Sequence, residues 1–131
     1  MALIRIDVVN NVRILSRAWA AIAGRDHRGI ETDIAISTKD VPTIAPQLLC
    51  CAAVEASPDP KPFPGTIISD CHLPVMGWRT GRSNINGEPI LEIDVAGGTT
   101  LRFQFPASTA KDCGTALAAA GTAALGTARP N

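Results

Sequence analysis

The stretch "PILEIDVAGGTTLRFQFPASTAKDCGTALAAAGTAAL", residues 89–125, carries the pattern that decides the fold. Its first seven residues and the later "TTLRFQF" (99–105) alternate apolar with polar side chains, which is the period of a half-buried strand. The "AGG" between them supplies a turn. Ser108 or Thr109 can then cap a helix through the alanine-rich end. The stretch therefore predicts two strands followed by one helix.

The residues before this stretch add a third strand, and the first half of the chain shows the same plan. "HLPVMGWRT" (72–80) is typical of a strand and is followed by the polar loop "GRSNINGE" (81–88). "IETDIAIS" (30–37) alternates in the same way, and Asp40 or Thr43 can cap a helix through "APQLLCCAAVEA". Each half is therefore predicted to be strands followed by a helix.

An offset of 69 residues aligns the two halves. It places Ile34 and Ile36 on Phe103 and Phe105, and Leu48 on Leu117. This alignment suggests a pseudo-repeat, although alternating apolar residues can be aligned by chance.

The N-terminal segment allows two interpretations. "ALIRIDVV" (2–9) reads as a strand, and Asn10-Asn11 can form a tight turn into a second strand over "VRILSRAWAAIAG" (12–24). The alternative for residues 11–23 is a helix, because the apolar side chains of this segment fall near one helical face. We prefer the strand.

The overall prediction is an α+β fold of antiparallel strands in two meanders, with two amphipathic helices packed on one face. We expect a single domain over 1–131. Its halves, 1–56 and 66–126, are joined by the proline-rich linker "SPDPKPFPG" (57–65), whose composition favours an extended backbone.

Charge and composition exclude several classes of protein. Twelve basic and twelve acidic residues cancel, so the basic excess of a nucleic-acid or membrane-surface protein is missing. Charged residues interrupt the N-terminal region where a signal peptide would be apolar, and no run reaches the length of a membrane span. We therefore expect a bacterial cytoplasmic protein whose four cysteines are reduced.

The cysteines do not have the spacing of a metal site. Adjacent side chains on a helix diverge by about 100°, so Cys50 and Cys51 cannot both address one ion, and one of them should pack as a small buried residue. Cys113 is expected in the first turn of the last helix, on its core face. Neither a metal nor a cofactor is predicted. A thiol-dependent enzyme is the alternative, with Cys71 as nucleophile and His27 and Asp70 as its partners.

Two arginine-containing loops are the candidate ligand site. Arginine forks bind carboxylate or phosphate, and a tryptophan face can stack on a planar ligand. The residues concerned are Arg25, Arg28, Trp78, Arg79 and Arg82, and the candidate ligand is a small anionic molecule.

The leading hypothesis is a small non-enzymatic binding or assembly module that forms a homodimer. The last helix has Leu117 and Leu125 as its only large apolar side chains, so it gains little by covering its own sheet. A second copy would supply the missing contact. The rival hypothesis is the thiol enzyme.

Overall fold

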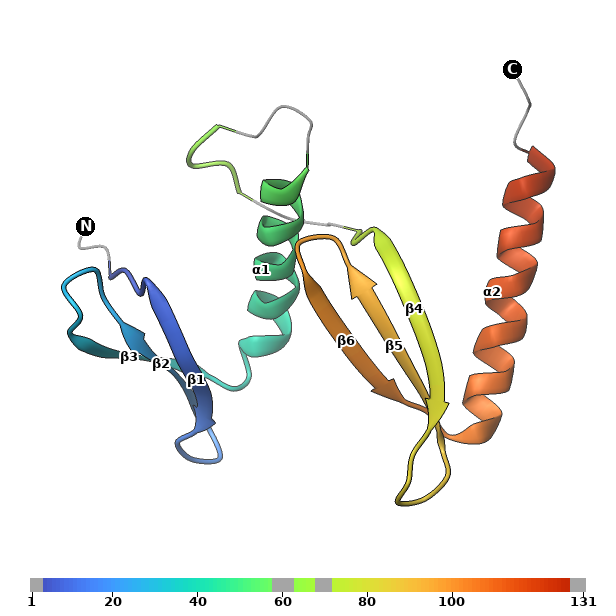
Figure 1. The fold of residues 1–131 in the computed structure, drawn as a ribbon, viewed down its shortest axis with the longest axis horizontal. Helices are drawn as coiled ribbons and strands as arrows, with labels where there is room; N and C mark the ends of the chain where they lie inside the picture. The colour runs from blue at the N-terminus through green and yellow to red at the C-terminus, as the bar shows by residue number, and fades with distance from the viewer. Residues whose placement is uncertain (1–3, 58–62, 68–71, 128–131) are drawn as a thin grey trace. The chain divides into compact units, whose positions relative to one another are not determined.

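The computed structural model describes residues 4–57, 63–67 and 72–127. The element order is β1 (Val8–Ile14), β2 (Trp19–Arg25), β3 (Glu31–Ser37), α1 (Val41–Ala56), β4 (Val75–Arg82), β5 (Pro89–Val95), β6 (Thr99–Gln104) and α2 (Ala107–Thr127). Three strands followed by a helix thus occur twice (Figure 1). The α+β class and the antiparallel strands are confirmed.

The chain divides into two compact units, and the division falls within α1, between Cys51 and Ala52. We call the unit that holds β1–β3 the first unit, and the unit that holds β4–β6 and α2 the second unit. Each sheet has its strands in chain order, and all neighbours are antiparallel. The expectation that both helices cover one face stays a prediction.

Both sheets have a β-bulge at the same place, early in their first strand. The register shifts between Val9 and Asn11 in β1 and between Val75 and Gly77 in β4. A bulge adds one residue to one strand and increases its twist. The two units therefore share this irregularity as well as their strand order.

The predicted turn at Asn10-Asn11 is wrong, because β1 runs through both residues. The bulge occupies this position instead of a turn. The first hairpin turn lies four residues beyond Asn11, where the backbone N–H groups of Leu15 and Ser16 donate to the Trp19 carbonyl at 2.9 and 3.2 Å. The helical alternative for residues 11–23 is also wrong, since Val12 pairs with Ile22 in the β1–β2 ladder.

Both helices start close to their predicted caps. The Ile44 N–H donates to the Asp40 carbonyl at 3.0 Å, so α1 begins directly after Asp40. The Ala110 N–H donates to the Pro106 carbonyl at 3.0 Å. Because α2 already begins at Ala107, Cys113 lies in its second turn and not in the first.

The buried apolar residues that the structure describes are few and mostly small: Ala21, Ala23, Cys50, Ala53 and Val95. None of the described residues of α2 is buried. The prediction that Cys113 faces a core is wrong, because its side chain is exposed. Among the described residues, no helix has the length and hydropathy needed to cross a membrane.

Candidate functional site

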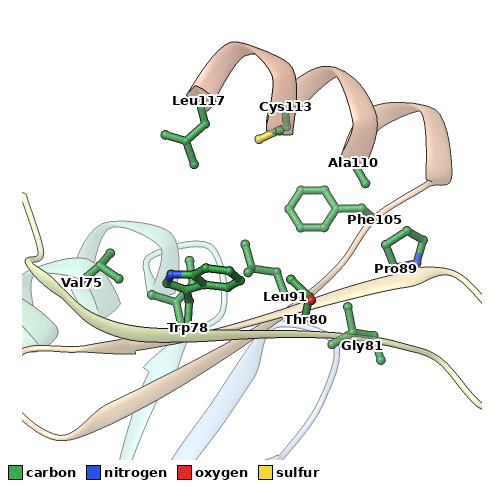
Figure 2. A pocket seen from close by; sticks show the side chains of 13 residues that line it. Val75, Trp78, Thr80, Gly81, Pro89, Leu91, Phe105, Ala110, Cys113 and Leu117 are labelled. Atoms are coloured by element: carbon green, nitrogen blue, oxygen red, sulfur yellow. The ribbon is translucent and has the colours of Figure 1, made fainter. Parts of the chain in front are cut away.

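An open apolar groove lies between the β4–β6 sheet and α2, wholly within the second unit (Figure 2). We call it the second groove; its volume is about 420 Å³. Side chains alternate between the two faces of a strand, so β4 contributes Trp78 and Thr80 to the floor, and β5 contributes Leu91 and Ile93. Phe105, just after β6, completes the floor.

The roof of the second groove is one face of α2. Ala110, Cys113, Gly114 and Leu117 line it, at the spacing of three and four residues that places side chains on one helical face. No charged residue is among the described residues that line the groove. The polar side-chain groups available there are the Thr80 hydroxyl, the Cys113 thiol and the Trp78 indole N–H. The groove can therefore bind apolar surface.

A smaller groove occupies the same place in the first unit. This first groove has a volume of about 160 Å³ and lies between one face of the β1–β3 sheet and the first half of α1. Its roof consists of Val41, Ile44, Ala45 and Leu48.

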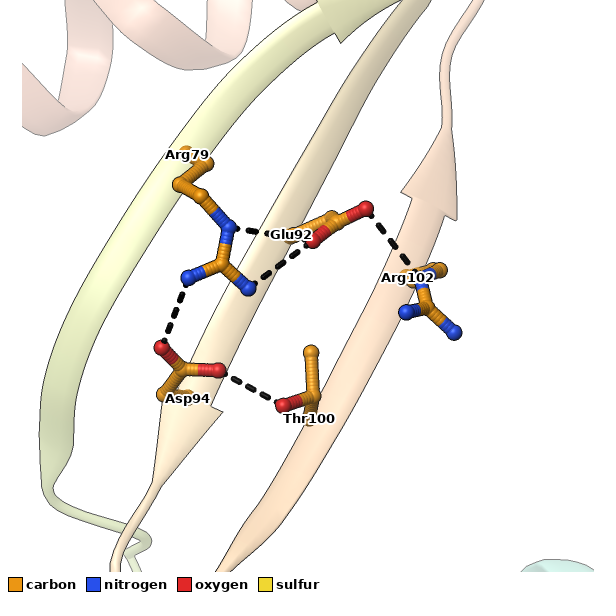
Figure 3. A network of polar contacts seen from close by, with 5 residues as sticks. All are labelled: Arg79, Glu92, Asp94, Thr100 and Arg102. Atoms are coloured by element: carbon orange, nitrogen blue, oxygen red, sulfur yellow. Dashed lines mark hydrogen bonds and ion pairs between the residues drawn. The ribbon is translucent and has the colours of Figure 1, made fainter.

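The opposite face of the β4–β6 sheet carries a network of charged side chains (Figure 3). The Arg79 guanidinium donates to Glu92 Oε2 from Nη2 at 2.9 Å and from Nε at 3.2 Å, and to Asp94 Oδ2 from Nη1 at 3.2 Å. Arg102 Nε donates to Glu92 Oε1 at 3.1 Å. The Thr100 hydroxyl donates to Asp94 Oδ1 at 2.6 Å.

These contacts favour the ionised forms of Arg79, Glu92 and Asp94. The hydrogen bond from Arg79, followed by that from Arg102, holds the pKa of Glu92 below its usual value. The Thr100 hydroxyl does the same for the pKa of Asp94, with Arg79 adding to the effect. The carboxylates in turn raise the pKa of Arg79, Glu92 most strongly. The network ties the three strands together on the polar face.

The arginines proposed as an anion site already have partners. Arg28 pairs with Asp26 at 2.9 Å, and Arg25 lies 4.0 Å from Glu31. Arg79 belongs to the network described above, and Arg82 Nε donates to the Gly87 carbonyl at 3.0 Å.

Trp78 and Arg79 are neighbours in β4 and face opposite sides of the sheet, so the stacking ring and the arginine do not meet. Arg25 and Arg28 belong to the first unit, whereas Trp78, Arg79 and Arg82 belong to the second. The anion site stays a prediction, and no contact described here supports it.

The thiol hypothesis also stays a prediction. His27 lies in the exposed turn between β2 and β3, but Asp70 and Cys71 lie outside the described residues. Cys51 and Cys113 are free and exposed, whereas Cys50 is buried and disulfide-bonded. The expectation of four reduced cysteines is therefore wrong for Cys50. The expectation that one of the adjacent pair packs inside is confirmed.

Over the described ranges, no three His, Cys, Asp or Glu side chains gather closely enough to hold a metal ion. The chain matches no protein-family model, and no curated protein or solved structure is significantly similar to it.

The second groove was not predicted from the sequence. Its floor follows from the alternation in 89–95, which was recognised. The signal that could have revealed its roof is the replacement of large side chains by small ones in the last helix, at the spacing of one helical face.

Proposed function

We propose that this chain is a non-enzymatic assembly module that works as a homodimer, with the outer half of α2 as the contact between the two copies. The observation that carries the proposal is the exposure of α2. The helix spans Ala107–Thr127 without one buried residue. Its two large apolar side chains, Leu117 and Leu125, are 71% and 79% exposed.

The outer half of α2, residues 116–127, lacks the charged side chains of a solvent-exposed helix. Residues 116–127 contain no charged side chain on any face of the helix. A helix that lacks a charged face is normally buried on several sides. The helix residues that line the second groove end at Leu117, so the sheet of its own unit does not cover the last ten residues.

Intrinsic helix propensity does not compensate for this exposure. Gly114, Gly121 and Gly126 each lower the stability of the helix by up to about 1 kcal/mol relative to alanine. Helices in proteins owe most of their stability to tertiary packing. A partner surface is therefore needed to hold α2.

A second copy is the partner that these observations favour. The net charge is zero, so no electrostatic attraction selects a partner of opposite charge. Small side chains let two helices approach closely, and a two-fold dimer would place the same surface on both sides of the contact.

Replacing Leu125 with glutamate tests this contact. Glutamate keeps helix propensity but would bury a charge at the interface in both copies. We expect the dissociation constant measured by sedimentation equilibrium to rise by at least about 100-fold, since each buried leucine contributes about 1.5–3 kcal/mol.

Ile85→Glu is the matched control, because Ile85 is 97% exposed in the loop between β4 and β5. It should leave the dissociation constant unchanged. Equal effects of the two variants, with unchanged circular dichroism, would rule out α2 as the contact.

A further inference from the structure

The two grooves are equivalent in position, so the lining residues and volume of the second groove can be compared with those of the first. The four roof residues of the first groove, Val41, Ile44, Ala45 and Leu48, correspond at a constant offset of 69 to Ala110, Cys113, Gly114 and Leu117. The two helices therefore present the same helical positions to their sheets.

The roof side chains of the second groove are smaller than those of the first at three of the four positions. From the first roof to the second, valine becomes alanine, isoleucine becomes cysteine, alanine becomes glycine, and leucine is kept. The floor changes the other way: the β-bulges align Val12 of β1 with Trp78 of β4, so the second floor gains an aromatic ring.

Despite its larger floor residue, the second groove has about 420 Å³ of space, against about 160 Å³ for the first. The same arrangement of strands and helix leaves much less space in the first unit. The opening of the second groove is therefore a property of its particular side chains and not a requirement of the fold.

We propose that the second groove binds an uncharged, apolar small molecule with a planar ring system. Its volume lies within the range of about 300–1,000 Å³ that is usual for small-molecule sites.

The lining determines the chemistry of the ligand. A charged ligand would lose its hydration without gaining a partner, because no described charged residue lines the groove. Trp78 and Phe105 offer aromatic rings on the floor, and such rings favour stacked or edge-to-face contacts with another ring (Figure 2). Small α2 side chains opposite them leave room for a flat molecule.

This inference goes beyond the proposed dimer and uses a different part of α2. The ligand would contact Ala110 to Leu117, whereas Leu125, which tests the dimer contact, lies beyond the groove. One proposal can therefore fail without the other.

A pair of fluorescent probes tests the ligand class on the full chain. N-phenyl-1-naphthylamine is uncharged and apolar, and 8-anilinonaphthalene-1-sulfonate has the same rings with an added sulfonate. We expect the uncharged probe to bind at least about tenfold more tightly in a fluorescence titration. Equal affinities, or no binding of the uncharged probe, would overturn the proposal.

Transplanting the roof of the first groove onto α2 tests the location. The variant Ala110→Val, Cys113→Ile, Gly114→Ala should bind the uncharged probe at least about tenfold more weakly, because the added methyl groups fill the space. Thr115→Val is the control, since Thr115 does not line the groove and precedes residues 116–127 of the proposed dimer contact. Unchanged binding in the folded triple variant would place the probe elsewhere and overturn the proposal.

A second readout needs no substitution. Cys113 lines the groove, whereas Cys51 is a free exposed cysteine on α1. At a free concentration at least twice its dissociation constant, the uncharged probe should slow iodoacetamide alkylation of Cys113 by at least about threefold. The alkylation rate of Cys51 should not change. Equal rates with and without bound probe would contradict the site. Binding that appears only in Leu125→Glu would show that a second copy fills the groove, and would also overturn the proposal.

Discussion

Gly24 shows how one residue fixes the distance between strands in the first unit. It lies in β2 opposite Val9, and a Cβ at this position would overlap the Val8 carbonyl oxygen and Ile6 Cγ2. Backbone atoms cannot move aside as a flexible side chain can. Glycine is therefore needed for the close approach of the N-terminal segment.

We expect Gly24→Ala to destabilise the first unit by about 1–3 kcal/mol, the usual cost of overpacking. Trp19 fluorescence in a Trp78→Phe background would report the unfolding of this unit in urea. Gly81→Ala in the second unit, followed by Trp78 fluorescence in a Trp19→Phe background, is the control, because a Cβ at Gly81 meets nothing within 4 Å. Its effect should stay within about 0.5 kcal/mol. A similar midpoint for parent and Gly24→Ala would show that the strands can separate without cost.

At the scale of elements, the two faces of the β4–β6 sheet differ: one carries apolar side chains and the other carries charged ones. Trp78 and Leu91 lie on the groove side, while Arg79 and Glu92 pair on the other. Glu92 accepts from Arg79 and Arg102, so it joins β5 to both neighbouring strands. The sheet should consequently depend on the ionisation of this carboxylate.

The sign of the pH dependence follows from the lowered pKa of Glu92. The carboxylate is more acidic in the folded sheet than in the unfolded chain, so its stabilising effect is present above the ordinary glutamate pKa of about 4.3. It is lost as the pH falls through the lower folded pKa. Asp94, whose pKa is also lowered, contributes in the same direction.

We expect the urea midpoint of the second unit, followed by Trp78 fluorescence in a Trp19→Phe background, to fall between about pH 5 and pH 3. Glu92→Gln should be less stable at pH 7 and should lose less on acidification. An equal acid-induced loss in parent and variant would mean that the network does not stabilise the sheet.

The elements that could be predicted from sequence are those whose signals lie between residues close together in the chain. The strand at 89–95 and the start of α1 after Asp40 were predicted because alternating side chains and capping residues act within a few positions, whereas α2 begins before its predicted caps, at Ala107. Asn10 and Asn11 were assigned to a turn because asparagine suits one, yet they lie in β1. Pairing with β2 decides their conformation, and that contact is not local.

The groove could not be predicted for a related reason. The spacing of Cys113 and Leu117 shows that they share a face, but not how far that face stands from the sheet. That distance depends on the side chains of three strands together. The carboxylates that pair with Arg28 and Arg79 were not foreseen from the sequence, because each pairing depends on how the chain folds locally, and the arginine site stays a prediction.

At the scale of the whole molecule, two units with one topology carry different surfaces. The first unit and the second share strand order and bulge position, but the second ends in a longer helix whose outer half carries no charge. An apolar helix without a covering surface is the feature that the proposed dimer explains. The dimer is therefore the main claim made for this chain.

The mass of the parent protein in solution tests this claim most directly. Multi-angle light scattering during size-exclusion chromatography, at high micromolar loading and neutral pH, should give twice the 13.7 kDa mass of the chain. Leu125→Glu, run under the same conditions, should elute later with the mass of one chain. A parent protein that elutes with the mass of a single chain at that concentration would contradict the account.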